Sequence, residues 1–168
     1  MTILSALYLR EAVDNIVIGL RGLKDANGDI AIGKVQRYLY PYPTTPNWAC
    51  IHMFGSSVAE QRDSSRRSNQ LWTIFIRVGI GNLNQGFEGR QQERMYEIVP
   101  LVMNTILEHP DLTFTGATTK PTYYLPGTVE ITSPPRTGVD DLRESGKFLY
   151  TEFGITMAFN VQLKPDRP

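Results

Sequence analysis

Residues 70–80 read Gln70-Leu-Trp-Thr-Ile-Phe-Ile-Arg-Val-Gly-Ile80, and this stretch decides the fold. Its residues alternate between two sets, and each set would lie on one face of a β-strand. One set is wholly apolar and consists of Trp72, Ile74, Ile76, Val78 and Ile80. The other set is also substantially apolar and includes Leu71, Thr73, Phe75 and Arg77. A strand that is apolar on both faces is predicted to lie in the interior of a sheet.

Further extended segments surround this central strand. Residues 30–40, 48–54 and 123–131 are rich in branched and aromatic side chains, which favour β-structure. The last strand is predicted to be long, because apolar residues or Thr occupy every second position from Leu149 to Leu163.

Two segments have the three- and four-residue apolar spacing of amphipathic helices. The first runs from Leu4 to Leu23 and ends before the turn signal Asp25-Ala-Asn-Gly28. The second runs from Gly89 to His109, where Pro100 is expected to kink or split it. The order of helix, strands, helix and strands predicts a single α+β domain over residues 1–168, with a mainly antiparallel β-sheet packed by two main helices.

Two polar stretches are expected to be long interaction loops. Residues 55–69 are rich in Ser and Arg, and residues 132–147 contain Pro134, Pro135, Gly138 and Gly146. Loops longer than about 12–15 residues are uncommon in compact domains and are usually functional or disordered. The first of them has few apolar residues to hold it, and it is therefore expected to be mobile in the free protein.

Charged residues in these stretches are the candidate protein contacts. The basic cluster consists of Arg62, Arg66 and Arg67. Guanidinium groups suit phosphates, but an acidic surface on a partner protein is the favoured interpretation. The second group consists of Asp140, Asp141 and Arg143. In the same stretch Asp140, Asp141 and Glu144 could hold a hard cation, but the neighbouring Arg143 and Lys147 favour a solvated, salt-bridged loop.

Charge and composition exclude several functions. Lys plus Arg and Asp plus Glu are both 17, so the net charge is zero, which argues against a dedicated nucleic-acid binder or a polybasic membrane anchor. Residues 1–84 hold nine basic and six acidic groups (+3) and residues 85–168 hold eight and eleven (−3), a distribution that could suit head-to-tail packing of like subunits. The chain has one Cys and two His, too few for a Cys/His zinc site. No cofactor and no membrane segment is expected.

Cys50 and His52 are the residues that leave an enzymatic function open. They are two positions apart on a predicted strand and would face the same way. A small enzyme or ligand-binding domain could use them as a nucleophile and base. The favoured interpretation is structural, with Cys50 as a small core hydrophobe and His52 as its neighbour.

Four segments of the chain carry a family resemblance. They are Leu9-Arg-Glu-Ala-Val-Asp-Asn-Ile16, Leu71-Trp-Thr-Ile-Phe-Ile-Arg-Val78, Arg94-Met-Tyr-Glu-Ile-Val-Pro-Leu-Val-Met103 with Leu107-Glu-His-Pro-Asp-Leu112, and Phe148-Leu-Tyr-Thr-Glu-Phe-Gly-Ile-Thr-Met-Ala-Phe159. In this order they resemble the tail terminator (tail completion) proteins of tailed bacteriophages. The resemblance implies a hexameric ring on the head-proximal end of the tail tube. Such a ring stops tube polymerisation and offers the docking surface for the head connector.

The resemblance also implies the partners and the location of the protein. The partners would be further copies of the chain, the tail tube protein and a head–tail connector or adaptor, with genomic DNA passing through the lumen without sequence-specific binding. The protein would be assembled in the host cytoplasm and reside in the tail or neck of the virion, without enzymatic activity. A different neck component, such as a connector or adaptor, remains an alternative. A terminator binds tube subunits, whereas an adaptor binds the portal.

Overall fold

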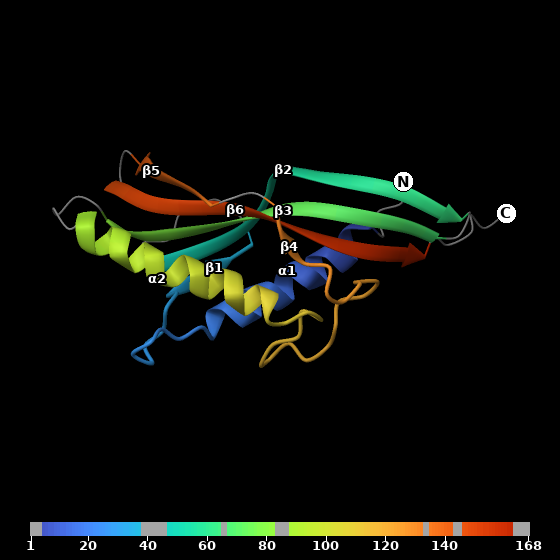
Figure 1. Cartoon of the computed structure of the whole chain (residues 1–168), viewed down its shortest axis with the longest axis horizontal. Helices are drawn as coiled ribbons and strands as arrows, with labels where there is room; N and C mark the ends of the chain where they lie inside the picture. The colour runs from blue at the N-terminus through green and yellow to red at the C-terminus, as the bar shows by residue number, and fades with distance from the viewer. Residues whose placement is uncertain are drawn as a thin grey trace.

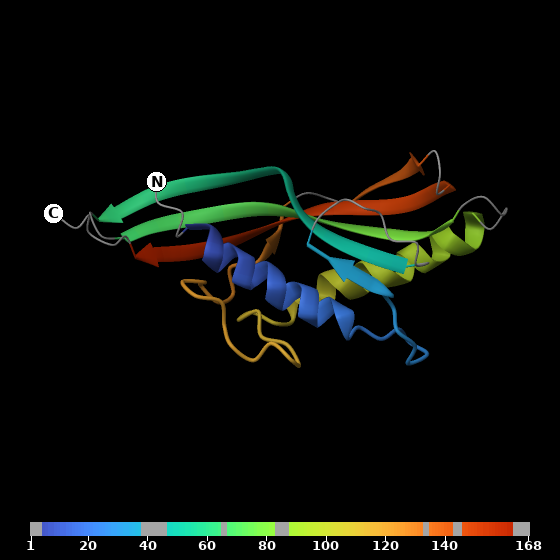
Figure 2. The ribbon, with the colours of Figure 1, turned by 180° about the vertical axis from the view of Figure 1, so that it is seen from behind.

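Two layers, one sheet and one pair of helices, make up the molecule (Figure 1). The computed structural model describes residues 5–37, 47–64, 67–82, 88–132, 135–142 and 146–162. Both helices lie on the same side of the sheet (Figures 1 and 2). The predicted α+β fold class is confirmed.

Six strands form the sheet in the order β1-β2-β3-β6-β4, with β5 also paired to β6. They are β1 (Lys34–Gln36), β2 (Asn47–Ser64), β3 (Arg67–Asn82), β4 (Glu130–Ile131), β5 (Arg136–Leu142) and β6 (Gly146–Gln162). The β1–β2 pair is parallel and the other pairs are antiparallel. The sheet is therefore mainly antiparallel, as predicted, and β3 lies in its interior between β2 and β6.

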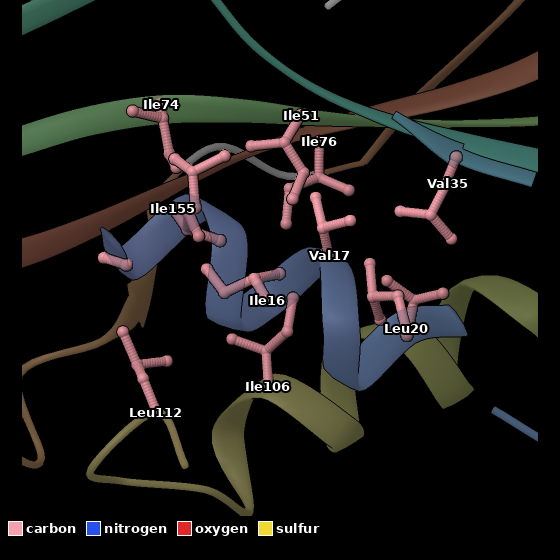
Figure 3. Close-up of a cluster of buried hydrophobic side chains, with 14 of the residues drawn as sticks. Ile16, Val17, Leu20, Val35, Ile51, Ile74, Ile76, Ile106, Leu112 and Ile155 are labelled. Atoms are coloured by element: carbon pink, nitrogen blue, oxygen red, sulfur yellow. The ribbon is translucent and has the colours of Figure 1, made fainter. Parts of the chain in front are cut away.

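The core lies between the sheet and the helices α1 (Ser5–Arg21) and α2 (Glu88–Leu107). Figure 3 shows Ile16 of α1 between Ile74 and Ile155 of the sheet and Ile106 of α2. All four of these side chains are fully buried. Each buried aliphatic side chain of this size contributes about 1.5–3 kcal/mol. The apolar stripes predicted for both helices therefore form the interface with the predicted core face of β3.

The helix α2 runs unbroken through Pro100. A proline inside a helix removes one backbone hydrogen bond and was expected to kink or split it. Pro100 itself is exposed, whereas Ile98, Val99 and Val102 are buried against the core. This burial on both sides of Pro100 keeps the two halves in one helix, and the predicted split does not occur.

The two stretches predicted as long loops are largely strands, so that prediction was wrong. Residues 55–64 complete β2 and residues 67–69 begin β3, with pairing that extends to Ser64 and Arg67 at the tip. Residues 136–142 form β5, which pairs along β6. Backbone groups hold both hairpins together, and a solvated antiparallel strand needs no apolar side chains on its exposed face. The polar composition of residues 55–69 and 132–147 therefore did not predict their secondary structure.

The extended segment predicted over residues 123–131 is mostly irregular. It contributes β4 at its end and one isolated bridge between Tyr124 and Phe159. Tyr123 and Gly127 adopt positive φ angles of 61° and 76°, which are incompatible with a continuous strand. The expected strand over 30–40 is likewise confined to β1, and residues 38–40 lie outside the described part of the chain.

The far ends of β2, β3 and β6 extend over the N-terminal end of α1, and their tips project past the helix layer (Figures 1 and 2). We call this three-stranded region the arm, and it consists of residues 57–64, 67–73 and 156–162. Its base is marked by an irregularity in β2, where residues 53–56 are inserted between the pairs His52–Phe75 and Ser57–Thr73. Such insertions bend a strand and increase its twist.

Candidate protein interface

The sheet has a second face, opposite the helices, which we call the outer face. Residues that alternate with the core side chains occupy it, and the strand register places Cys50, Arg77 and Glu152 side by side across β2, β3 and β6. His52 and Phe75 form the adjacent row, with ring centroids 5.8 Å apart and nearly parallel planes. The predicted shared orientation of Cys50 and His52 is consistent with this register.

Three of these residues form a polar cluster. His52 Nε2 and Arg77 Nε lie 2.9 Å and 2.8 Å from the same carboxylate oxygen of Glu152. Burial alone would raise the pKa of Glu152, but the hydrogen bonds from His52 and Arg77 outweigh it and lower that pKa below its usual value. Glu152 is therefore a carboxylate at neutral pH. Because a carboxylate only accepts, His52 donates through Nε2.

The environment of Cys50 argues against nucleophilic chemistry. Its side chain is fully buried. Burial raises the pKa of the Cys50 thiol to about 12, against a smaller opposing effect of the Arg77 charge. Nucleophilic attack requires the thiolate, which is scarcely populated at such a pKa. The neighbouring His52 bonds to Glu152, so the geometry supports the structural interpretation of both residues.

On the arm, the outer face is uncharged across its centre. Two rows cross it, Ala59–Leu71–Ala158 and Gln61–Asn69–Asn160. Leu71 is 44% exposed between the two small alanines, and Asn160 Nδ2 donates to Asn69 Oδ1 over 2.5 Å. A shallow hollow of about 270 Å³ lies over these rows. This surface offers apolar and amide contacts to a partner.

The opposite face of the arm is anchored to α1. The Tyr8 hydroxyl donates to Gln70 Oε1, and Trp72 Nε1 lies 3.1 Å from the same oxygen. The Tyr8 ring also packs on Phe159 at a centroid distance of 4.7 Å. Burial raises the pKa of Tyr8, although the Trp72 hydrogen bond partly opposes this effect. These contacts attach the arm to the helix layer.

The basic candidate residues lie at the tip of the arm. Arg67 is exposed and begins β3, opposite Ser64 of β2 and Gln162 of β6. Arg62 lies on β2 at the position opposite Ser68. Arg66 lies outside the described residues. Arg62 and Arg67 are thus placed on strands near a hairpin end and not on a long loop.

The acidic candidate residues lie at the other end of the sheet (Figure 1). Asp140 and Asp141 occupy positions on β5 opposite Phe148 and Lys147 of β6. Arg143 lies outside the described residues. The structure therefore does not bring the two predicted groups together within one chain. Within the described ranges, no three His, Cys, Asp or Glu side chains gather in a metal-binding arrangement.

Sequence reasoning missed the cluster of His52, Arg77 and Glu152. The feature of the sequence that indicated this cluster was Arg77, a charged residue in the middle of an otherwise apolar strand. A buried charge in such a position needs a partner. Sequence spacing does not identify the partner, since Glu152 reaches Arg77 only through the β3–β6 register.

Comparisons with known proteins find similarity in structure but not in sequence. No family model matches the sequence, and no curated protein sequence matches it. Among solved structures, the chain is similar to one described as "Virion of native gene transfer agent (GTA) particle". The two share 9% sequence identity and a TM-score of 0.48 over 94% of this chain and 95% of that chain. In the described part of the protein, neither helix has the length and apolar character to cross a membrane.

Proposed function

We propose that this chain is a structural protein of a tailed-phage-type virion and acts as its tail terminator. In this role it forms a hexameric ring on the head-proximal end of the tail tube, stops tube polymerisation and presents the surface on which the head connector docks. The basis is the resemblance of four segments to tail terminators. The observation that supports it is that these segments form α1, β3, α2 and β6, from which an arm projects with Arg62 and Arg67 at its tip.

A terminator works by binding, because it must occupy the growing tube end more tightly than the next tube subunit does. The arm suits this task, since it presents an uncharged surface around Leu71 and an exposed cation at Arg67. Complementary charges across an interface mainly accelerate encounter and select the partner. We assign the tube contact to the arm tip, and we expect carboxylates on the tube subunit that meets it.

The proposed role is not enzymatic. The thiol of Cys50, which the competing enzymatic interpretation needs, is buried and has a pKa of about 12. The remaining interactions of the ring follow from the same proposal. The β5 end, with Asp140 and Asp141, is available to a neighbouring copy or to the connector, and genomic DNA passes through the lumen without sequence-specific contacts.

Deletion of the gene tests the role directly. Electron microscopy of lysates should then show over-long tails or tails that fail to join heads, and the wild-type gene supplied in trans should restore them. Normal tail lengths in the deletion would contradict the terminator role. A pull-down with purified tube subunits and portal discriminates the neck alternatives, because a terminator retains the tube subunit and an adaptor retains the portal.

A further inference from the structure

Two strand edges of the sheet have no partner among the described residues. On one side, β1 pairs with β2 only at Trp48, Ala49 and Cys50. No described strand pairs with the outer edge of β2 from Ile51 to Ser64. On the other side, β5 pairs with β6 and with no further described strand. Unpaired backbone N–H and C=O groups along an edge form a template for another strand.

The arm edge of β2 has few of the features that block such pairing. Proteins protect free edges with lysine, proline, bulges, inward-pointing charges or very short strands. The insertion at residues 53–56 lies at the base of the arm edge, and Glu60 on its core-side face accepts a hydrogen bond from Ser68. Residues 51–61 of β2 contain neither lysine nor proline. Met53 and Val58 are 42% and 40% exposed. Val58 stands opposite Trp72, on the core-side face, where an added strand would cover it.

The strand directions make the two edges compatible between copies. Strand β2 is antiparallel to β3, and β3 is antiparallel to β6, so β2 and β6 run the same way. Strand β5 is antiparallel to β6 and therefore runs opposite to β2. When a second copy continues the sheet in the same orientation, its β2 lies antiparallel to β5 of the first copy.

We infer that the β5 edge of one copy pairs with the arm edge of β2 in the next copy. The occupant of the free edge is thus a second copy of this chain, joined head to tail. This inference rests on the ring in the proposed function and specifies the contact that builds it. Repeated around a ring, the contact closes the sheets into one barrel, and closure is the arrangement that removes all free edges.

The two edges are offset along the strand direction, as the strands of a closed barrel are. Arg136 of β5 is level with Arg77 of β3, through the pairs Arg136–Glu152 and Glu152–Arg77, whereas Ala59 on the arm edge is level with Leu71. These levels differ by six residues (77 − 71), which corresponds to about 20 Å at ~3.3 Å per residue. Four strands span about 19 Å at ~4.8 Å each.

An offset of this size requires strands tilted by about 46° to the ring axis. Closed barrels have tilts of about 35–45° and a fixed stagger, so the estimate falls near the range that closure demands. Pairing further along the arm would increase the tilt. The contact should therefore involve the base of the arm, around Ala59, more than its tip.

Thiol cross-linking tests the pairing. Ala59 and Arg136 occupy outer-face positions on the two edges, because they lie opposite Leu71 and Glu152 respectively. A chain carrying both Ala59→Cys and Arg136→Cys, treated with a short bis-maleimide, should give a ladder of cross-linked species that ends at the ring size. Each single variant should give no ladder. The native Cys50 is fully buried, and the unmodified chain measures its background.

A charge placed on the β2 edge provides the second part of the test. Val58→Lys should abolish the ladder, because pairing would bury the ammonium group on the core-side face. Leu71→Lys is the matched control, since Leu71 is equally exposed but lies on β3 and not on the edge. The control should retain the ladder within twofold of the parent. Loss of the ladder in both variants, or in neither, would overturn the edge pairing.

The remaining outcomes separate this inference from the proposed function. Cross-linked dimers from Ala59→Cys alone would indicate symmetric β2–β2 pairing and overturn the inference. A ring seen by light scattering or on particles, without a ladder, would overturn the inference and leave the terminator role intact. A monomer at millimolar concentration, with no ring on purified particles, would contradict both the edge pairing and the terminator role.

Discussion

The indole of Trp48 lies across Gly79 on the outer face of the sheet. The two residues are cross-strand partners on β2 and β3, and a Cβ atom added at Gly79 would stand 2.1 Å from Trp48 Cε2. Tyr150 and Gly138 repeat this arrangement, since the Tyr150 hydroxyl oxygen would lie 2.7 Å from a Cβ at Gly138. The glycines let the aromatic rings lie flat, which keeps this end of the outer face smooth.

Replacing Gly79 by Ala should displace the Trp48 indole from its fully buried position. Overpacking of this kind typically costs about 1–3 kcal/mol of the free energy of unfolding. Urea unfolding followed by tryptophan fluorescence measures the change. Gly22→Ala is the control, because nothing lies within 4 Å of a Cβ at Gly22 and its φ is not positive. Equal stability of the two variants would contradict the packing described for Trp48.

The core position of β3 can be tested with a buried charge. Ile76 is fully buried, and Ile76→Asp would bury a carboxylate without a partner, which costs several kcal/mol and should prevent folding. Leu71→Asp places the same charge on the exposed face of the same strand and should fold. Circular dichroism melts compare the two. A cooperative melt of the Ile76→Asp protein would show that the strand is misassigned.

The polar cluster on the outer face should make stability depend on pH through Glu152. Its folded pKa lies below the ordinary value of 4.5, so the stability that it contributes is present above that value and is lost as the pH falls through the folded pKa. Glu152→Gln should cost about 1.5–3 kcal/mol of the free energy of unfolding at pH 7, the range for hydrogen bonds to charged groups. The difference in the free energy of unfolding between Glu152→Gln and the wild type should shrink as the pH falls towards 3.

Urea titrations of both proteins at the two pH values measure this effect. Glu97→Gln is the control, because Glu97 pairs with Arg94 at an exposed site, where ion pairs contribute about 0–1 kcal/mol. A constant difference between wild type and Glu152→Gln at pH 7 and pH 3 would show that the charge of Glu152 is not what stabilises the cluster.

The parts of the fold that could be predicted from sequence are those in which side-chain periodicity reports burial. The alternation from Trp72 to Ile80 and the stripes of α1 and α2 record the core directly. The hairpin of the arm that β2 and β3 form over residues 55–69 carried no such record. Its strands are held by backbone pairing to neighbours, so the polar run before Ser64 resembled a loop. The candidate contacts Arg62, Arg67, Asp140 and Asp141 were therefore assigned to the wrong kind of element.

The polar cluster could not be assembled from sequence for a different reason. Glu152 meets His52 and Arg77 through the register of three strands, and the insertion at residues 53–56 shifts that register in a way that no periodicity encodes. Spacing suggested a pair between Cys50 and His52, whereas cross-strand geometry pairs His52 with a residue from the far end of the chain.

The arm tip provides the test of function. Changing Arg62, Arg66 and Arg67 together to Glu should weaken docking to the tube, because carboxylates on the tube subunit would then meet like charges. The fold should survive, since surface substitutions usually change stability by less than about 0.5 kcal/mol each. The expected phenotype is over-long tails or tails that fail to join heads, scored by electron microscopy of complemented lysates.

A matched control separates the position of the charges from their number. Lys24, Lys34 and Lys120 are exposed and lie outside the three strands of the arm. Changing all three to Glu alters the net charge by the same amount as the arm-tip variant. This control should retain normal tails, and circular dichroism melts should show that both triple variants remain folded. If the arm-tip variant supports normal tail lengths and infectivity while folded, the tip is not the tube contact. If both variants fail equally, net charge and not the arm governs docking, because charge at a distance then acts as strongly as charge at the tip.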